Sequence, residues 1–198
     1  MDRVDMVKKL KPKLNKKRYV HSVGVEYTAA TLAFVYGADV QKARIAGLLH
    51  DCAKCIPTDE KLKKAKKLGM PISKCEKANP DLLHGKLGAY YAKEDYGVKD
   101  DDILAAITYH TTGRPAMSIL EKIIFVSDYI EPNRKMIRDL TEIRREAYED
   151  IDKCIVHILG NTLEYLLYKD TVIDETTRET FNYYVSEIKN KDSKSKKN

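Results

Sequence analysis

The sequence has no Trp, only three Phe, and few of the residues that interrupt helices, with six Pro and nine Gly among 198 residues. Scarce Gly and Pro exclude collagen-like and low-complexity chains, and 43% hydrophobic residues exclude a wholly disordered one. No run approaches the roughly 20 apolar residues of a membrane helix, and the Lys-rich pattern of residues 1–17 has no signal-peptide apolar stretch. We therefore expect a cytoplasmic protein with one core.

Cysteine is also scarce, and the four cysteines show no regular disulfide framework. Cys52 and Cys55 form the one pair with metal or redox spacing. The pair has no second Cys-x-x-Cys for a zinc ribbon and no surrounding strand pattern for a thioredoxin-like motif. We therefore expect Cys52, Cys55, Cys75 and Cys154 to be ordinary free thiols.

A basic surface on the body of the protein is missing as well. Residues 1–18 carry +6 and residues 189–198 carry +4, which leaves −4 for the rest of a chain whose net charge is +6. Positive charge confined to two ends is weaker evidence for a nucleic-acid groove than a basic face would be. The charge pattern therefore favours solvated ends and argues against nucleic acid or a membrane as the partner.

What the sequence does contain is helical periodicity with capping residues. Apolar positions recur every three or four residues, and no repeat, strand or hairpin pattern interrupts them. Candidate N-caps are Asn15, Asp39, Asn79 and Asp100, and Ser118 and Thr176 each begin a capping box. The expected helices cover about residues 16–36, 40–50, 58–69, 80–96, 101–110, 119–131, 141–168 and 177–189. The predicted fold is all-α, with residues 190–198 disordered.

Candidate functional residues lie on the apolar faces of these helices. Four of the five histidines stand near helix ends, and each faces the side expected to be buried. Taken singly, each is more often a hydrogen-bonded core histidine, and a single acid in a helix is often a surface residue. Together, imidazole and carboxylate suit Fe, Mn, Zn or another divalent ion, and six donors exceed one tetrahedral site. Two ions that share a bridging carboxylate are the economical arrangement. The six residues are His21, His50, Asp51, His84, His110 and Asp128.

The order His21, His50-Asp51, Asp128 follows the pattern of the HD-domain metal-dependent phosphohydrolases. The flanking residues are more specific and closely resemble the bacterial YqeK family. They are Ala46-Gly-Leu-Leu-His-Asp-Cys-Ala-Lys54, His84-Gly85, His110-Thr-Thr-Gly113 and Lys122-Ile-Ile-Phe-Val-Ser-Asp-Tyr-Ile-Glu-Pro-Asn-Arg134. This resemblance runs from about Arg18 to Tyr184. It implies an HD-type helical bundle over residues 18–189, preceded by a packed basic helix within 1–17 and followed by the disordered tail 190–198.

The resemblance also implies an activity, namely symmetrical hydrolysis of diadenosine tetraphosphate to two ADP at a two-iron centre. Carried over by position, His21, His50, Asp51 and Asp128 would hold one ion, and Asp51, His84 and His110 the second, with Asp51 bridging. A hydroxide bridging two ions roughly 3.5 to 4 Å apart would attack the phosphorus. Mn, Co, Ni or Zn would be accepted in vitro, and the oligomeric state stays open, a homodimer included.

Several neighbouring residues are placed to bind phosphate. Lys54 and Arg134 flank the motifs and are expected to act with Asp51 in catalysis, and Arg18 lies one turn before His21. We expect substrate contacts from Arg18, Lys54, Thr111, Thr112, Gly113 and Arg134. For each cation a solvated surface charge is the alternative, and helix termination alone would explain Gly113. Tyr109 and Tyr129 are candidates to stack on adenine. His157 belongs to no motif and is expected to be structural or exposed.

Two other functions remain open at this point. One is an HD-type nucleotidase or a cyclic-nucleotide or alarmone phosphodiesterase, which shares the metal core and differs in its pocket. The other is a regulatory nucleotide- or RNA-binding protein whose metal site is structural and whose basic ends carry the function. The Lys-rich termini favour this last hypothesis, whereas the concentration of candidate ligands and cations around one site favours a hydrolase.

Overall fold

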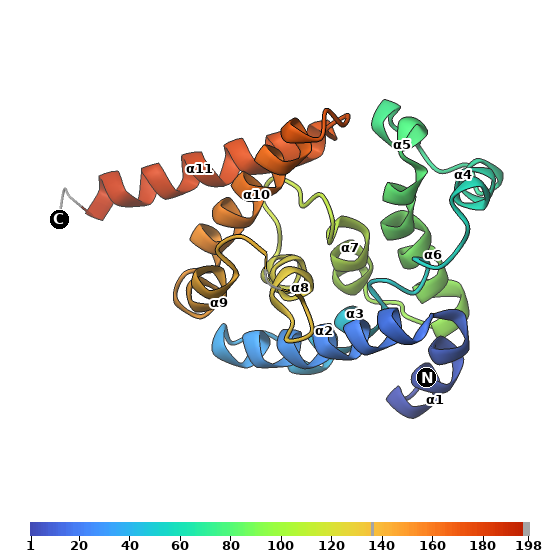
Figure 1. Cartoon of the computed structure of the whole chain (residues 1–198). Helices are drawn as coiled ribbons and strands as arrows, with labels where there is room; N and C mark the ends of the chain where they lie inside the picture. The colour runs from blue at the N-terminus through green and yellow to red at the C-terminus, as the bar shows by residue number, and fades with distance from the viewer. Residues whose placement is uncertain (136, 196–198) are drawn as a thin grey trace.

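The computed structural model describes residues 1–135 and 137–195, and within these the chain is helical with no strand, as the sequence predicts. Figure 1 shows the arrangement of the helices. In chain order they are α1 (Arg3–Leu10), the 3-10 turn η1 (Lys11–Lys13), α2 (Lys16–Val35), α3 (Val40–Leu49), α4 (Thr58–Lys67), α5 (Lys74–Ala78), the 3-10 turn η2 (Pro80–Leu83), α6 (His84–Tyr96), α7 (Asp101–Tyr109), α8 (Ile119–Ile130), α9 (Leu140–Glu149), α10 (Ile151–Tyr168) and α11 (Glu175–Ser195).

Side-chain caps begin α2, α3, α7 and α8 where the sequence predicts them, whereas the predicted cap Asn79 makes no side-chain hydrogen bond at the start of η2. Asn15 accepts a hydrogen bond from the Arg18 amide, and Asp39 and Asp100 accept two amides each. The Ser118 capping box is complete at the start of α8. These caps satisfy backbone amides that would otherwise have no partner in the first turn, and so they fix where each helix starts.

Two helix boundaries differ from the prediction because aspartates that were not predicted as caps begin the helices. The segment expected as one helix over 141–168 is two helices, because Asp150 adopts an extended conformation and its carboxylate caps Asp152 and Lys153. At α11 the cap is Asp174, which accepts the Thr176 amide, so the predicted Thr176 capping box is wrong. Near residue 80 the chain also makes η2 before α6 begins, and α5 was not predicted.

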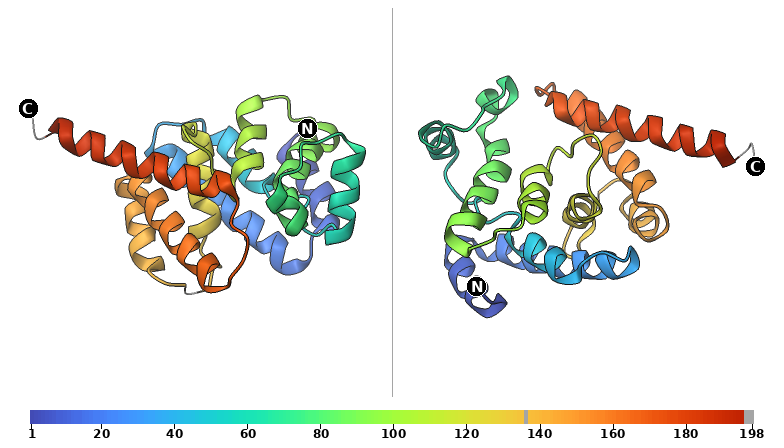
Figure 2. Two further views of the ribbon diagram at one scale, coloured as in Figure 1. Left: turned by 90° about the horizontal axis from the view of Figure 1, so that it is seen from above. Right: turned by 180° about the vertical axis from the view of Figure 1, so that it is seen from behind.

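The two ends of the chain are attached to the body. Met6 and Leu10 of α1 are buried in the main core, and Arg3 forms a two-point ion pair with buried Glu26 of α2. At the other end α11 is helical through Ser195, and Lys191 pairs with Asp152 at 2.6 Å. The prediction that disorder begins at residue 190 is therefore wrong for residues 190–195. Figure 2 shows the last turns of α11 extending past the body. Residues 196–198 lie outside the described residues.

The centre of the bundle is formed by α2, α3, α7 and α8, which pack against one another around a single main core. Two glycines allow neighbouring helices to approach each other closely. A Cβ on Gly47 of α3 would lie 3.0 Å from the Glu26 Cα of α2, and one on Gly85 of α6 would lie 2.5 Å from the Thr108 carbonyl oxygen of α7. Close packing therefore brings the ends of these helices together. In the described part of the chain, every helix is too short or too polar to cross a membrane.

Candidate metal centre

The six histidine and aspartate residues singled out from the sequence converge on one place. They lie near the start of α2, at the end of α3, at the first residue of α6, at the end of α7 and on α8. His21, His50, Asp51, His84 and His110 are buried, and Asp128 has 20% of its side chain exposed. Their donor atoms form three overlapping groups, and within each group the atoms lie within 4.8 Å of one another.

Asp51 stands between the two halves of this cluster. Its Oδ2 lies 3.7 Å from His21 Nε2 and 3.4 Å from His50 Nε2. Its Oδ1 lies 3.4 Å from His84 Nε2 and 3.7 Å from His110 Nε2. We call these halves the Oδ2 side, which also includes Asp128, and the Oδ1 side. Each carboxylate oxygen of Asp51 thus faces its own pair of imidazoles.

The opposite nitrogen of every imidazole is held by an acceptor, which fixes the ring orientation. His50 Nδ1 donates to the Gly47 carbonyl and His110 Nδ1 to the Ile107 carbonyl, both at 2.7 Å. His84 Nδ1 donates to the Asp81 carbonyl at 2.5 Å, and His21 Nδ1 to Glu131 Oε1 at 3.0 Å. With the proton on Nδ1, each Nε2 presents a lone pair to the centre of the cluster.

Among these six residues the inward-facing atoms are all acceptors, an arrangement that is suited to cations. The Nε2 atoms of His21 and His50 are 3.3 Å apart, and those of His84 and His110 are 3.0 Å apart, so lone pairs face each other. Asp51 Oδ1 is buried and has no hydrogen-bond partner among the described residues. Burial, with the charges of His110 and Lys54, lowers the pKa of His84 to about 3, which keeps the ring neutral. Because imidazole and carboxylate are donors for divalent ions, the residues present fit a divalent-metal centre.

Glu131 belongs to this site but was not predicted as a functional residue. It is 1% exposed, and its Oε1 accepts from His21 while Oε2 accepts from the backbone and side chain of Asn133. A carboxylate behind a ligating imidazole orients the ring and raises its basicity. The sequence signal was an acid directly before Pro132, at a helix end where a cation is usual.

The arginines expected to bind phosphate are paired with the carboxylates of the cluster. Arg134 Nη2 lies 2.6 Å from Asp128 Oδ1, and Arg18 Nη1 lies 2.5 Å from Asp51 Oδ2. Asp128 and Asp51 therefore each have a guanidinium partner. Burial would raise the pKa of Asp128, but contact with His21 and the charge of Arg134 hold it well below its usual value.

Lys54 lies on the opposite side of the cluster from these arginines. Its Nζ is 3.4 Å from His84 Nε2, and burial lowers its pKa. Thr111 is in the same place, with its hydroxyl 3.2 Å from His84 Nε2. Thr112 instead donates to the Gly113 carbonyl, and a Cβ on Gly113 would lie 2.8 Å from Thr180 Cγ2. Among Thr111, Thr112 and Gly113, therefore, Thr111 is the residue that contacts the cluster.

A cavity of 790 Å³ opens beside the Oδ2 side, between the start of α2 and the loop after α8. His21 and Glu131 form part of its wall. The cations that line it are Lys16, Lys17, Arg18, Arg134 and Lys135. The first three also surround the α2 N-terminus, where backbone amides favour anions. Lys16, Lys17 and Lys135 were not predicted as site residues, although three successive cations directly after an N-cap are a readable anion-binding pattern.

The remaining predicted residues have ordinary surroundings. All four cysteines are free, as expected, and burial raises the pKa of Cys52 to about 12, so that it stays a thiol. His157 lies outside the cluster and contacts Glu146 and Asp139. Tyr109 packs under the guanidinium of Arg114, with 5.0 Å from the guanidinium carbon to the ring centre. Tyr129, by contrast, lines a separate cavity together with residues of α10.

Comparison with known proteins agrees with this geometry. The HD domain family matches residues 18–133, a range that includes all six residues of the cluster. The chain therefore belongs to the HD-domain family.

Curated relatives match nearly the full length. A protein of Bacillus subtilis named symmetrical bis(5'-nucleosyl)-tetraphosphatase is 41% identical over 94% of this chain and 99% of its own. The protein of the same name from Halalkalibacterium halodurans is 41% identical over 96% and 100%. A crystal structure from Clostridium acetobutylicum, described as a predicted HD superfamily hydrolase involved in NAD metabolism, superposes with a TM-score of 0.91 at 41% identity, covering 94% of this chain and 98% of that one.

Proposed function

We propose that this protein hydrolyses dinucleoside polyphosphates and cleaves diadenosine tetraphosphate symmetrically to two ADP. The observation that carries the proposal is the two-sided position of Asp51 beside a cavity lined by five cations. Relatives with that activity in their names, at 41% identity over nearly the whole chain, support it. A tetraphosphate carries several negative charges, and the cavity supplies matching positive charge next to the cluster.

The ligand assignment is part of the proposal. His21, His50, Asp51 and Asp128 would hold one ion, and Asp51, His84 and His110 the second, with Asp51 bridging. We propose two iron ions in the cell, and Mn, Co, Ni or Zn as substitutes in vitro, because all of these accept imidazole and carboxylate. When bound, the ions supply positive charge to phosphoryl oxygens and lower the pKa of water toward neutrality.

The cations of the chain bind and orient the phosphates. Arg18 and Arg134 stand between the carboxylates and the cavity, so their remaining N–H groups can donate to phosphate oxygens while one edge stays on Asp51 or Asp128. Lys54 and Thr111 can donate to the phosphate on the Oδ1 side. These donors hold the bond to be broken against the cluster, and no Ser or Cys nucleophile is needed.

Product analysis tests the proposal. Protein purified and loaded with iron without oxygen is incubated with diadenosine tetraphosphate, and products are separated by anion-exchange chromatography. We expect ADP alone, no product from His50→Ala, and unchanged turnover in His157→Ala, a histidine outside the cluster. ATP with AMP would overturn symmetrical cleavage, and no product from metal-loaded protein would overturn the function.

A substrate panel separates the alternative HD-type functions. NAD⁺ belongs in it because the C. acetobutylicum structure is connected by its description with NAD metabolism. Nucleoside monophosphates and a cyclic dinucleotide test the nucleotidase and phosphodiesterase alternatives. We expect kcat/KM for the dinucleoside tetraphosphate to exceed that for each of these, and the reverse order would replace our proposal.

A further inference from the structure

A second cavity, of 630 Å³, lies between the end of α10 and the loop that follows α8. Ile137 lines both cavities, so the two are neighbours. Tyr129, the residue directly after Asp128, forms part of the wall of the second cavity. The volume falls in the range of small-molecule sites. The function proposed above leaves this cavity unused.

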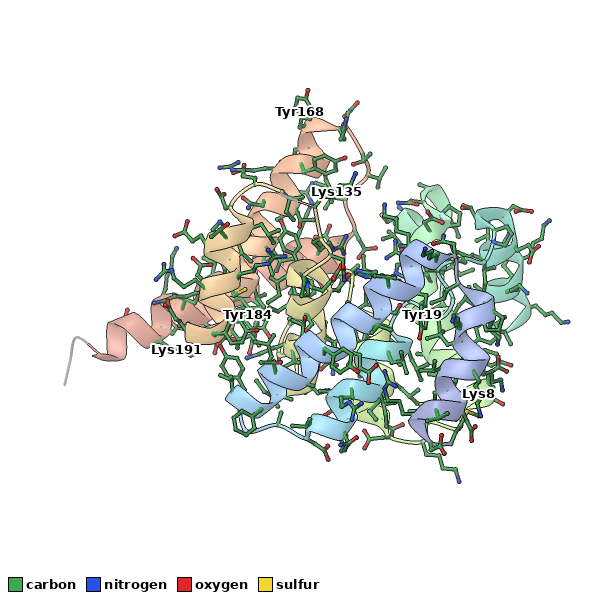
Figure 3. The ribbon with its side chains drawn as sticks, turned by 60° about the horizontal axis from the view of Figure 1, so that its bottom comes forward. Lys8, Tyr19, Lys135, Tyr168, Tyr184 and Lys191 are labelled. Atoms are coloured by element: carbon green, nitrogen blue, oxygen red, sulfur yellow. The ribbon has the colours of Figure 1, made fainter. Side chains whose placement is uncertain are left out.

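Aromatic side chains dominate one wall of this second cavity. Asn161, Tyr165 and Tyr168 line it and follow one another along a single face of α10, at spacings of four and three residues. The two tyrosines are 59% and 83% exposed. Figure 3 shows Tyr168 at the end of α10, toward the same end of the molecule as Lys135. Exposed rings beside an amide that both donates and accepts suit a flat heterocycle.

The charges of the two cavities differ strongly. Five cations line the first cavity. Among the described residues that line the second, the one cation is Arg138, which is paired with Glu164 at 2.5 Å. A phosphate chain is therefore favoured in the first cavity, and an uncharged group in the second. A nucleotide with both parts would extend across Ile137 from one cavity to the other.

We propose that the second cavity binds one nucleobase of the dinucleoside tetraphosphate, by stacking on Tyr165 and Tyr168. This rests on the proposed function and adds a specificity site to it. A tetraphosphate chain consists of identical units, so phosphate contacts alone allow it to shift by one unit. A base held in a fixed place sets which phosphoanhydride bond reaches the cluster, and hence whether cleavage is symmetrical.

The test measures binding to the metal-loaded protein by calorimetry. The first ligand is diadenosine tetraphosphate with a methylene group in place of the central bridging oxygen, and the second is the same methylene-bridged tetraphosphate without either adenosine. Stacking contributes about 1–3 kcal/mol per base, so we expect about tenfold tighter binding of the first ligand by the wild type. The double variant Tyr165→Ala/Tyr168→Ala should lose this excess. Both proteins are measured with the same two ligands. The effect of the charge difference between the ligands therefore cancels when the wild type is compared with the double variant.

Tyr148→Ala is the matched control, since Tyr148 is an exposed tyrosine on α9 that does not line the cavity. It should retain the tenfold excess. Equal binding of the two ligands by the wild type, or an excess that survives in the double variant, would overturn the nucleobase site.

The same ligands separate this proposal from the proposed function. Symmetrical hydrolysis with no binding excess would leave the function standing and remove the nucleobase site. A binding excess that depends on Tyr165 and Tyr168, without hydrolysis of the natural compound, would keep the site and remove the function. If both hold, we also expect the double variant to release some ATP and AMP beside ADP.

Discussion

The two sides of Asp51 differ in donors and in support. The Oδ2 side combines two imidazoles with two carboxylates, and it has Glu131 behind His21 and two arginines beside it. The Oδ1 side has two imidazoles and a share of Asp51, and backbone carbonyls hold its rings. More carboxylates mean stronger binding of a divalent ion, and fewer protein ligands leave positions open for substrate. We therefore expect the Oδ2 side to bind its ion more tightly. The ion on the Oδ1 side should have more coordination positions free for substrate.

Replacing Asp51 should have the largest effect because it removes the residue that joins the sides. Asp51→Asn keeps the shape of the side chain but removes the negative charge. We expect turnover below detection and loss of metal from both sides, measured by product analysis and metal content, with the helical circular dichroism retained. Full activity in this variant would contradict the role of Asp51.

Gly85→Ala should damage the Oδ1 side selectively. The added Cβ would lie 2.5 Å from the Thr108 carbonyl oxygen, which must push α6 away from α7 and separate His84 from His110. We expect a loss of about 1–3 kcal/mol of stability, as for other overpacked sites, and a loss of metal from the Oδ1 side. Urea unfolding and metal analysis measure these effects.

Gly160→Ala is the matched control for that variant. Gly160 lies within α10, and the nearest atom to its added Cβ is Phe181 Cε2 at 3.8 Å. Alanine should therefore fit and raise helix stability by about 0.5–1 kcal/mol. Equal effects of the two substitutions would mean that helix propensity, and not the close approach of α6 and α7, decides the outcome.

Glu131→Gln tests the support behind the Oδ2 side. Glutamine keeps an oxygen near His21 but loses the charge, and changes of this kind typically reduce metal affinity about 10- to 100-fold. We expect weaker binding at the Oδ2 side with little change at the Oδ1 side, measured by competition with a chelator. The exposed Glu142→Gln provides the control, and an unchanged affinity in Glu131→Gln would assign Glu131 a purely structural role.

His157 gives the smallest effect and contrasts an imidazole outside the cluster with those inside it. Burial lowers its pKa, but hydrogen bonds with Glu146 and Asp139 outweigh this and raise it. Its contribution to stability is therefore full below the unfolded pKa of about 6.5 and is lost as pH rises through the folded value. We expect His157→Gln to lower stability by less than about 1 kcal/mol at pH 5 and not at pH 9. A penalty that grows with pH in thermal unfolding would contradict this.

The metal-binding donors of the cluster could be predicted from the sequence, but the residue that orients His21 could not. Periodicity and caps predict which helix faces are buried, so His21, His50 and His110 could be placed near a common core. Glu131 could not, because its role depends on how α8 packs against α2. The break at Asp150 was missed for a related reason, since an apolar period continues on both sides of a residue that caps α10. Asp39 and Asp100 could be predicted as caps because each stands where an apolar pattern begins, whereas Asp150 lies inside a continuous one.

The most direct test of the two-sided centre is titration of the metal-free protein with Fe²⁺ in the absence of oxygen, followed by calorimetry and metal analysis. We predict two ions per chain that bind with different affinities. His84→Ala should keep the tighter ion, and His21→Ala should weaken or lose it. A single ion per chain, abolished equally by both substitutions, would contradict a centre divided by Asp51.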